Sequence, residues 1–481
     1  MLRDVTHNIT DGLLGFATST GDGVHVKIGV SPVVSDKPIA ITGDMSAATI
    51  KQRLGLSPLA DAAMDSVQFG SNRIYCFPVK ATTPGTAQTV TKKGTGFGGL
   101  TVSGDPTNRF SVVVKITARG GFNAASFAAS IDGGNTFRDE NTVPVAGEYD
   151  LAGTGLTLKF AEATQEEQKP SSFLVGDTFS FETTAPSMTN GDVLTAIEKL
   201  KNFSTEHEGV HIVGESTLAL WQAVSEAQLE LMNIYKKPMF FVMESPAPEP
   251  DENGELTDWA LQMEADRKKI KNYNIQVAAA WGRLVRLDNT TQLVNLAGIV
   301  FGLYARASVQ TSIGKTRTEA GFGIPRTKLL ELAPAGMDNA IIELLDLAGF
   351  LTLREYDGLD DYFVYHTKMM SPDGSDYRYA EDVRVLNKIV RETRKEGLQL
   401  LNDDFDLEDV QGELETKAKF MFPPLQRMID NGEISSAEII VPEGQDQTII
   451  EDEKMRVKVR YVSRGYIREV EVDLGRARPG E

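Results

Sequence analysis

Residues 210–244 read VHIVGESTLALWQAVSEAQLELMNIYKKPMFFVME, and this stretch predicts the fold at the centre of the chain. The β-branched run at 210–214 favours a strand. The residues after it repeat apolar side chains as a helix does, and the apolar run at 239–244 favours a second strand. A helical pattern at 257–272 and another apolar run at 275–281 continue the alternation. Strands that alternate with helices predict a largely parallel sheet covered by helices.

The helix inside this stretch is predicted to start after Ser216, whose hydroxyl would cap its first turn. Its buried face is predicted from apolar residues that recur at spacings of about three to four. These residues are Leu218, Trp221, Val224, Leu229 and Met232.

A small α/β unit is predicted on the N-terminal side, at residues 13–84. Residues 24–30 alternate apolar and other side chains, which predicts a strand with one buried face. Ser46 is placed to cap a short helix, and the strand predicted at 73–79 would bury Cys76 as inert core.

Residues 85–185 differ from both flanks in composition. They are rich in Gly, Thr and Ser and hold short β-branched runs separated by turn sequences. Such spacing predicts an all-β domain, either a sandwich or a small barrel. Because α/β patterning resumes after it, we expect it to be inserted into another domain, with an α/β core domain at 186–375.

The last part of the chain is predicted to be a helical and strand-containing domain at 376–465, followed by a terminal arm at 466–481. Helical patterns cover 379–401 and 408–430. Pro423 and the proline after it must kink or divide the second helix, because proline removes a backbone donor and clashes with the preceding turn.

The two C-terminal segments MRVKVRYV (455–462) and YIREVEVDL (466–474) alternate like strands. The first carries a basic face and the second an acidic face, so pairing between such strands would be attractive. Either they form a terminal hairpin, or a strand is donated to a neighbouring copy, which removes an exposed sheet edge. Residues 1–12, which are polar and mixed, and residues 466–481 are predicted to be terminal arms. The predicted arm residues are Leu2, Val5, Ile9, Tyr466, Val470, Val472 and Leu474.

Together these patterns predict a multidomain α/β (α+β) chain with a mixed core, an inserted all-β domain and terminal strand-forming arms. The charge balance, 49 Lys and Arg against 68 Asp and Glu, gives −19 and argues against generic nucleic-acid binding. One cysteine excludes a disulfide framework within the chain. Nothing resembles an apolar run of about 18 residues, so we expect no membrane insertion. The N-terminal sequence has no apolar signal core.

The sharpest chemical motif is His207-Glu208-Gly209-Val210-His211, which matches the H-E-x-x-H pattern of zinc hydrolases. That chemistry needs a helix that places both histidines on one face, with the glutamate activating the metal-bound water. The glycine and the β-branched residues after it instead favour a loop that enters a strand, which separates the two histidines. A zinc-dependent hydrolase is therefore kept as an alternative, and a core strand is the favoured interpretation.

The other motifs are incomplete. The glycine-rich stretch at 94–99 has no helix after it to receive a phosphate, and the Gly-Lys-Thr at 314–316 lacks the earlier glycine of a P-loop. We therefore predict no catalytic, cofactor-binding or metal-binding residues, no cofactor and no enzymatic activity.

VHVKIGVSP (24–32) and FGSNRIYCFPVKA (69–81) resemble the opening unit of the tail sheath proteins of contractile phage tails and related injection machines. NLAGIVFGLYARAS (295–308) resembles a further family segment. The run from LLDLAGF (344–350) through the helix at 379–401 looks like the sheath core. Departures occur at Phe350, His366 and Val383, where the family usually has Asn, Arg and Arg.

The resemblance implies a structural subunit that polymerises as stacked hexameric rings around an inner tail tube and contracts to drive the tube through a cell envelope. It also implies that residues 1–12 and 466–474 are arms that link adjacent subunits. Its partners would be further copies of itself, the inner tube protein, and baseplate and tail terminator proteins, without nucleic acid. It would be located in the virion tail after assembly in the host bacterial cytoplasm. A baseplate or decoration component of a phage particle is the other alternative.

Overall fold

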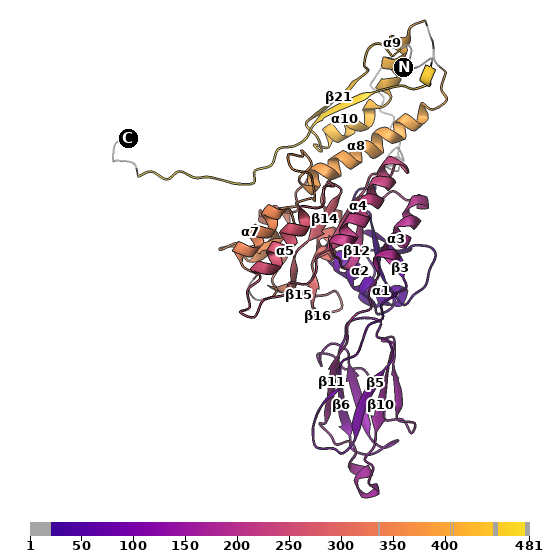
Figure 1. Cartoon of the computed structure of the whole chain (residues 1–481), viewed down its shortest axis with the longest axis vertical. Coiled ribbons are helices and arrows are strands. Elements are labelled where there is room, and N and C mark those ends of the chain that lie inside the picture. Colours follow the sequence, from indigo (N-terminus) through magenta and orange to yellow (C-terminus); the bar gives the residue numbers. More distant parts are fainter. Residues whose placement is uncertain (1–20, 335–336, 405, 407, 446–450, 477–481) are drawn as a thin grey trace, which may run out of the picture. The chain divides into compact units, whose positions relative to one another are not determined.

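The computed structural model describes residues 21–334, 337–404, 406, 408–445 and 451–476. The chain divides into two compact units, Met1–Arg384 and Val385–Glu481, and each is described by itself (Figure 1). The finer domain boundaries predicted from the sequence stay predictions.

A six-stranded sheet forms the centre of the first unit, with the strand order β14-β13-β12-β1-β3-β2. Neighbouring strands pair in parallel except for β2, which runs antiparallel to β3. The predicted β-α-β-α-β alternation is therefore confirmed. The strands are β1 (His25–Val30), β2 (Ile39–Thr42), β3 (Arg73–Val79), β12 (Gly209–Glu215), β13 (Phe240–Glu244) and β14 (Ile275–Ala278).

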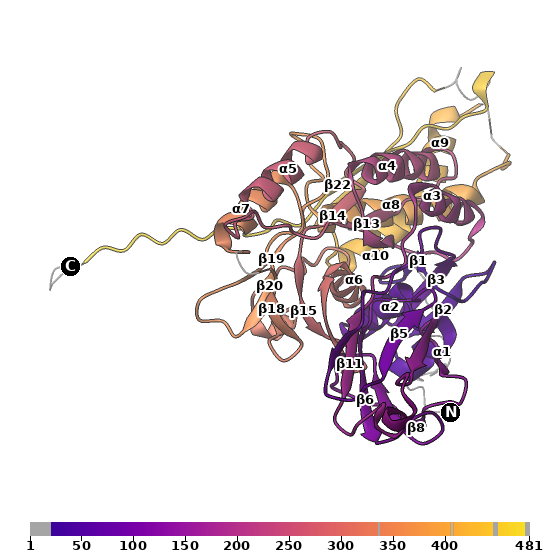
Figure 2. The same cartoon turned by 60° about the horizontal axis from the view of Figure 1, so that its bottom comes forward.

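Helices cover both faces of this sheet, and Figure 2 shows α3 and α4 on the opposite side from α2 and α6. Ser46 caps α1 and Ser57 caps α2, each by accepting a hydrogen bond from a backbone N–H of the first turn. The helices of the unit are α1 (Ala47–Leu54), α2 (Pro58–Gln68), α3 (Asn190–Glu198), α4 (Leu218–Asn233), α5 (Thr257–Arg267), α6 (Ala297–Arg306) and α7 (Asn339–Ala348).

Two predictions about individual elements are wrong. Strand β1 was expected to bury one face, but all six of its residues are buried, because apolar helices lie against both sides of the sheet. Ser216 does not cap α4: its hydroxyl donates to the Glu244 carbonyl and accepts from the indole N–H of Trp221. The predicted face of α4 is correct at Trp221 and Val224, whereas Leu229 points to solvent.

Residues 91–182 fold into two antiparallel sheets, ordered β5-β10-β9 and β4-β11-β6-β7-β8, which share one apolar cluster. The cluster contains alternating residues of β6 and β10, such as Val112, Val114 and Leu158. The strands are β4 (Thr91–Lys93), β5 (Gly99–Ser103), β6 (Ser111–Ala118), β7 (Ser126–Ser130), β8 (Asn141–Thr142), β9 (Glu148–Leu151), β10 (Leu156–Ala161) and β11 (Thr178–Glu182).

Two small sheets complete the first unit, in the orders β16-β15-β18 and β17-β20-β19. Their strands are β15 (Trp281–Val285), β16 (Thr291–Asn295), β17 (Ile324–Pro325), β18 (Leu329–Leu332), β19 (Leu353–Glu355) and β20 (Asp361–Val364).

In the second unit the helical pattern is divided at the prolines, as predicted. Helix α9 (Val410–Lys419) ends before α10 (Phe422–Asp430), whose first turn holds both prolines. Helix α8 (Ala380–Gln399) begins in the first unit and continues into the second. A two-stranded antiparallel sheet, β21 (Ser436–Ile440) with β22 (Lys458–Val462), packs on α10.

Candidate functional site

The H-E-x-x-H motif is a loop that runs into strand β12, as its β-branched residues predicted. His207 lies before the strand, with its Nδ1 2.9 Å from the carbonyl oxygen of Thr205, whereas His211 is buried inside the strand. The extended backbone therefore keeps the two imidazoles from sharing one helix face. Within the described residues no group of three or more His, Cys, Asp or Glu side chains is arranged to hold a metal ion.

Glu208, the residue that would activate water in a zinc enzyme, is instead held by a buried arginine. Its carboxylate accepts from the Arg384 guanidinium, with Nη2 to Oε2 at 3.1 Å, and also accepts from the N–H of Gly23 at 2.8 Å. Arg384 donates further to the carbonyls of Tyr304 and Ala307. These contacts give Glu208 a structural role that joins β12, α6 and α8.

A buried chain of polar groups crosses the sheet from β1 to β13. The Lys27 ammonium donates to His211 Nδ1 at 2.7 Å, and since Nδ1 accepts, Nε2 carries the proton and donates to Glu244 Oε1 at 3.0 Å. Burial lowers the pKa of Lys27 to about 8 and raises the pKa of Glu244 to about 7. Burial and the neighbouring Lys27 charge lower the pKa of His211 well below its ordinary value.

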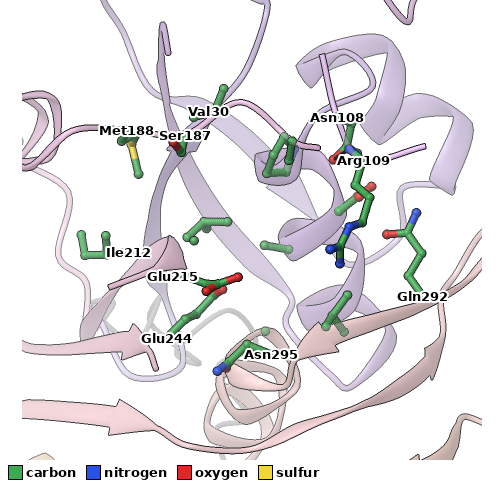
Figure 3. Close-up of a pocket in the computed structure, with 18 of the residues that line it drawn as sticks. Val30, Asn108, Arg109, Ser187, Met188, Ile212, Glu215, Glu244, Gln292 and Asn295 are labelled. Atoms are coloured by element: carbon green, nitrogen blue, oxygen red, sulfur yellow. Dashed lines mark hydrogen bonds between the residues drawn. The ribbon is translucent and has the colours of Figure 1, made fainter. Parts of the chain in front are cut away.

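A cavity of about 520 Å³ lies where β1, β12 and β13 end (Figure 3). One wall holds Asp61 and Asp65, both paired with Arg286, whose Nε lies 3.1 Å from Asp65 Oδ1. Burial raises the pKa of Asp65 to about 6, although Arg286 opposes that shift. The side chains of Glu215 and Glu244, register partners on β12 and β13, project into the cavity. The sequence motifs singled out neither this cavity nor its charged groups.

The predicted C-terminal arm lies in the second unit as an extended segment without strand pairing in the described part of the chain. Ile467, Val470, Val472 and Leu474 are exposed, at 68% or more of their full area. The alternative hairpin does not form: 466–474 pairs with no strand in the described part of the chain, and β22 pairs instead with β21, a strand that the sequence interpretation missed.

The β21–β22 sheet has an apolar face and a charged face. Tyr461 pairs with Ala437 and Val459 pairs with Ile439, while the exposed Arg460 guanidinium lies 3.5 Å from the Glu438 carboxylate. Within the described residues no further strand pairs with either outer edge. Open strand edges present unpaired backbone groups, so both edges are suited to accept another strand. The predicted N-terminal arm residues, Leu2, Val5 and Ile9, lie outside the described residues.

Comparisons with known proteins identify the fold. Residues 2–366 match the N-terminal domain of the family DUF2586, and residues 376–481 match its C-terminal domain. No curated protein matches the sequence significantly.

Three solved structures are similar over almost the whole chain. The sheath tail protein from Desulfitobacterium hafniense is 13% identical, with a TM-score of 0.50 over 96% of this chain and 100% of that one. The PVC sheath complex of an extracellular contractile injection system, in its contracted state, is 11% identical, with a TM-score of 0.53 over 99% of this chain and 98% of that one. A chain of the anti-feeding prophage baseplate, in its contracted state, is 11% identical, with a TM-score of 0.52 over 99% of this chain and 98% of that one.

At such low identity these likenesses establish the fold. They confirm the predicted remote resemblance to contractile tail sheaths, and the mixed α/β architecture agrees with it. Among the described residues, no helix combines the length and apolar character that a bilayer crossing requires.

Proposed function

This chain belongs to the DUF2586 family, and from that premise we propose that it is the structural subunit of a contractile tail sheath. Copies would stack as hexameric rings around an inner tail tube and contract to drive the tube through an envelope. The role is structural rather than enzymatic. Its partners would be the tube, baseplate and tail terminator proteins of a virion tail assembled in the host bacterial cytoplasm.

The observation that carries this proposal is the exposed, alternating segment 466–474, which lies in the same unit as a two-stranded sheet with open edges. Exposed valines and leucines in an extended chain are costly in water, at about 25 cal/mol per Å². Strand addition to another copy would bury them and satisfy the backbone groups of the sheet edge. Because such a contact is not reciprocal, repeating it generates rings or helical polymers.

Charge favours the outer edge of β22 as the acceptor for this segment. On β22 the side chains of Lys458 and Arg460 lie on the face opposite Val459 and Tyr461. If the arm packs its valines on the same side as Tyr461, its acidic residues lie beside the two cations. The edge of β21 presents Glu438 on that face, so an acidic arm is repelled there. Residues 1–12 would supply the second linking arm.

Deleting residues 466–481 tests the proposal. The truncated chain is expected to stay folded by circular dichroism, because the deleted part that the structure describes packs little against the rest. Electron microscopy of the full-length chain should show concentration-dependent tubes, and the truncated chain should form none.

A matched pair of double variants separates strand donation from general solubility effects. Val470→Asp with Val472→Asp should abolish tubes. Val145→Asp with Val175→Asp changes valines of similar exposure, 69% and 65% against 74% and 68%, and should leave tubes intact. Tubes from the truncated chain would refute the arm model. A fixed small oligomer of the full-length chain would favour a baseplate or decoration protein instead.

A further inference from the structure

A second cavity, of about 400 Å³, lies in the first unit between the C-terminal ends of α5 and α7 and the loop that precedes α8. Five basic and two acidic side chains line it, although the whole chain carries a net charge of −19. The lining charged residues are Arg267, Lys268, Lys271, Lys368 and Arg378, with Glu264 and Asp373.

Two of these cations are already paired. The Lys268 ammonium lies 2.8 Å from the Glu264 carboxylate one helical turn earlier, and Lys368 lies 3.7 Å from Asp346. Among the residues that the structure describes, this leaves three lining cations without an ion-pair partner, those of Arg267, Lys271 and Arg378, and one lining carboxylate, Asp373.

The ends of the two helices account for only part of the remaining charge. Each helix C-terminus carries about half a negative charge, so α5 and α7 together offset about one of the cations. With Asp373 counted, about one positive charge stays without compensation inside a concave site.

Arg267 is the one cation of these three that is partly buried, whereas Lys271 and Arg378 are exposed. Its two terminal nitrogens donate to the carbonyls of Ile270 and Ser371, both at 2.8 Å, and no carboxylate lies within ion-pair distance of it in the described part of the chain. Its buried Nε has no hydrogen-bond partner there, and burial lowers the pKa of its guanidinium. A partly buried arginine is stabilised far more by an anion than by carbonyls alone.

We propose that this cavity is an anion-binding site that takes a carboxylate or phosphate group between Arg267, Lys271 and Arg378. Arg267 is anchored by its two carbonyl contacts and fixes the position of the anion. The other two cations, those of Lys271 and Arg378, lie at exposed loop positions and supply flexible donors. The volume admits an anion together with the group that bears it.

The anion comes either from a free oxyanion or from acidic side chains of a second copy. The chain itself offers an exposed acidic loop at 249–255, which contains Glu249, Asp251, Glu252 and Glu255. A site of this kind lets subunits of the same negative sign attract one another locally. It goes beyond the arm contacts and does not depend on them.

Calorimetric titration of the full-length chain tests the site. The probes are inorganic phosphate at constant ionic strength and a synthetic peptide of residues 247–257. A control peptide carries Gln or Asn in place of each Glu or Asp. Wild-type protein is expected to bind phosphate, the acidic peptide, or both, with saturation, and not to bind the amide peptide.

Lys271→Gln with Arg378→Gln should weaken that binding at least tenfold. The control, Lys93→Gln with Arg317→Gln, removes the same charge from exposed positions outside the cavity and should bind like wild type. Binding of phosphate alone identifies a free oxyanion, whereas tighter binding of the peptide identifies a second copy. Absence of saturable binding, or equal weakening by the control, overturns the proposal. Because no tubes are required, this result is separate from the sheath assembly test.

Discussion

The guanidinium of Arg384 is paired with the carboxylate of Glu208, although 176 positions separate the two residues. Both are buried, with no more than 2% of either residue exposed. The pair joins the start of α8 to the entry of β12, so it connects the central sheet to the helix that leads into the second unit. The glutamate of the H-E-x-x-H sequence therefore stabilises the fold through this ion pair.

Glu208→Gln should therefore destabilise the first unit strongly. Removing one partner of a buried ion pair leaves the other charge uncompensated, which costs about 3–5 kcal/mol. Urea denaturation followed by circular dichroism measures the loss. Glu226→Gln, an exposed position on α4, should change the free energy of unfolding by less than about 0.5 kcal/mol. A small effect at Glu208 would contradict the structural role of the pair.

Replacing either of two glycines in different helices by alanine should change the free energy of unfolding, and the two changes should have opposite signs. A Cβ at Gly302 would lie 2.6 Å from Phe69 Cβ and 2.7 Å from the Ser66 carbonyl, because α6 packs closely on α2. Gly302→Ala is expected to cost about 1–3 kcal/mol through overpacking. At Gly397 the nearest atom lies 3.7 Å away, so Gly397→Ala should stabilise α8 by about 0.5–1 kcal/mol. Thermal unfolding of both variants checks the two signs.

The parallel sheet could be predicted because its strands and helices alternate with clear periods, and each period depends only on neighbouring residues. The burial of both faces of β1 could not be predicted, because Lys27 has a charged side chain of a kind that is usually exposed. Its partner His211 is 184 positions away, and only the folded chain brings the two together. A buried charge with a distant partner has no local signature in sequence.

Strand β22 could be predicted from the alternation of 455–462, whereas its pairing could not, and the linking arm at 466–474 stays a prediction. Strand β22 pairs with 436–440 rather than with 466–474, the nearer segment along the chain, and its other edge carries no strand among the described residues. Strand β21 also packs on α10, and such packing leaves no mark in the alternation of either strand. The cavity lined by Arg267 could not be predicted either, because Arg267, Gly349 and Arg378 come from three separate segments of the sequence.

The buried carboxyl of Glu244 should make stability depend on pH. Burial raises its pKa from 4.5 to about 7 against the opposing charges of Lys27 and Arg286, with His211 and Glu215 beside it. Between pH 4.5 and pH 7 the carboxyl of Glu244 holds a proton in the folded chain that it releases in the unfolded chain. The contribution of this protonation to the free energy of unfolding is therefore present below pH 4.5 and is lost as pH rises through 7.

Glu244→Gln removes this titration. The free energy of unfolding of wild type relative to the variant should fall by about 3 kcal/mol between pH 4.5 and pH 8. Urea titrations at four or five pH values in that interval measure it. A difference that stays constant across the interval would mean that Glu244 titrates normally in the folded chain.

Charge reversal on β22 should weaken assembly without unfolding the subunit. Lys458→Glu with Arg460→Glu places like charges beside the acidic face of an incoming arm, where each cross-strand pair contributes about 0.2–1 kcal/mol. Losing two attractions and gaining two repulsions should raise the concentration needed for tubes about tenfold, which corresponds to about 1.4 kcal/mol. The exposed contact between Arg460 and Glu438 contributes little to the fold, so circular dichroism should stay unchanged.

Restoring complementarity gives the decisive comparison. Adding Glu469→Lys and Glu471→Lys to the reversed chain should return tube formation to near the wild-type concentration, because the cationic arm then meets an acidic edge. Lys93→Glu with Arg317→Glu shifts the net charge equally at exposed positions of the first unit. This control should leave the concentration needed for tubes within about twofold of the wild-type value. If the compensated chain assembles no better than the reversed one, the acidic arm does not pair with β22. The donated strand must then be accepted at another edge.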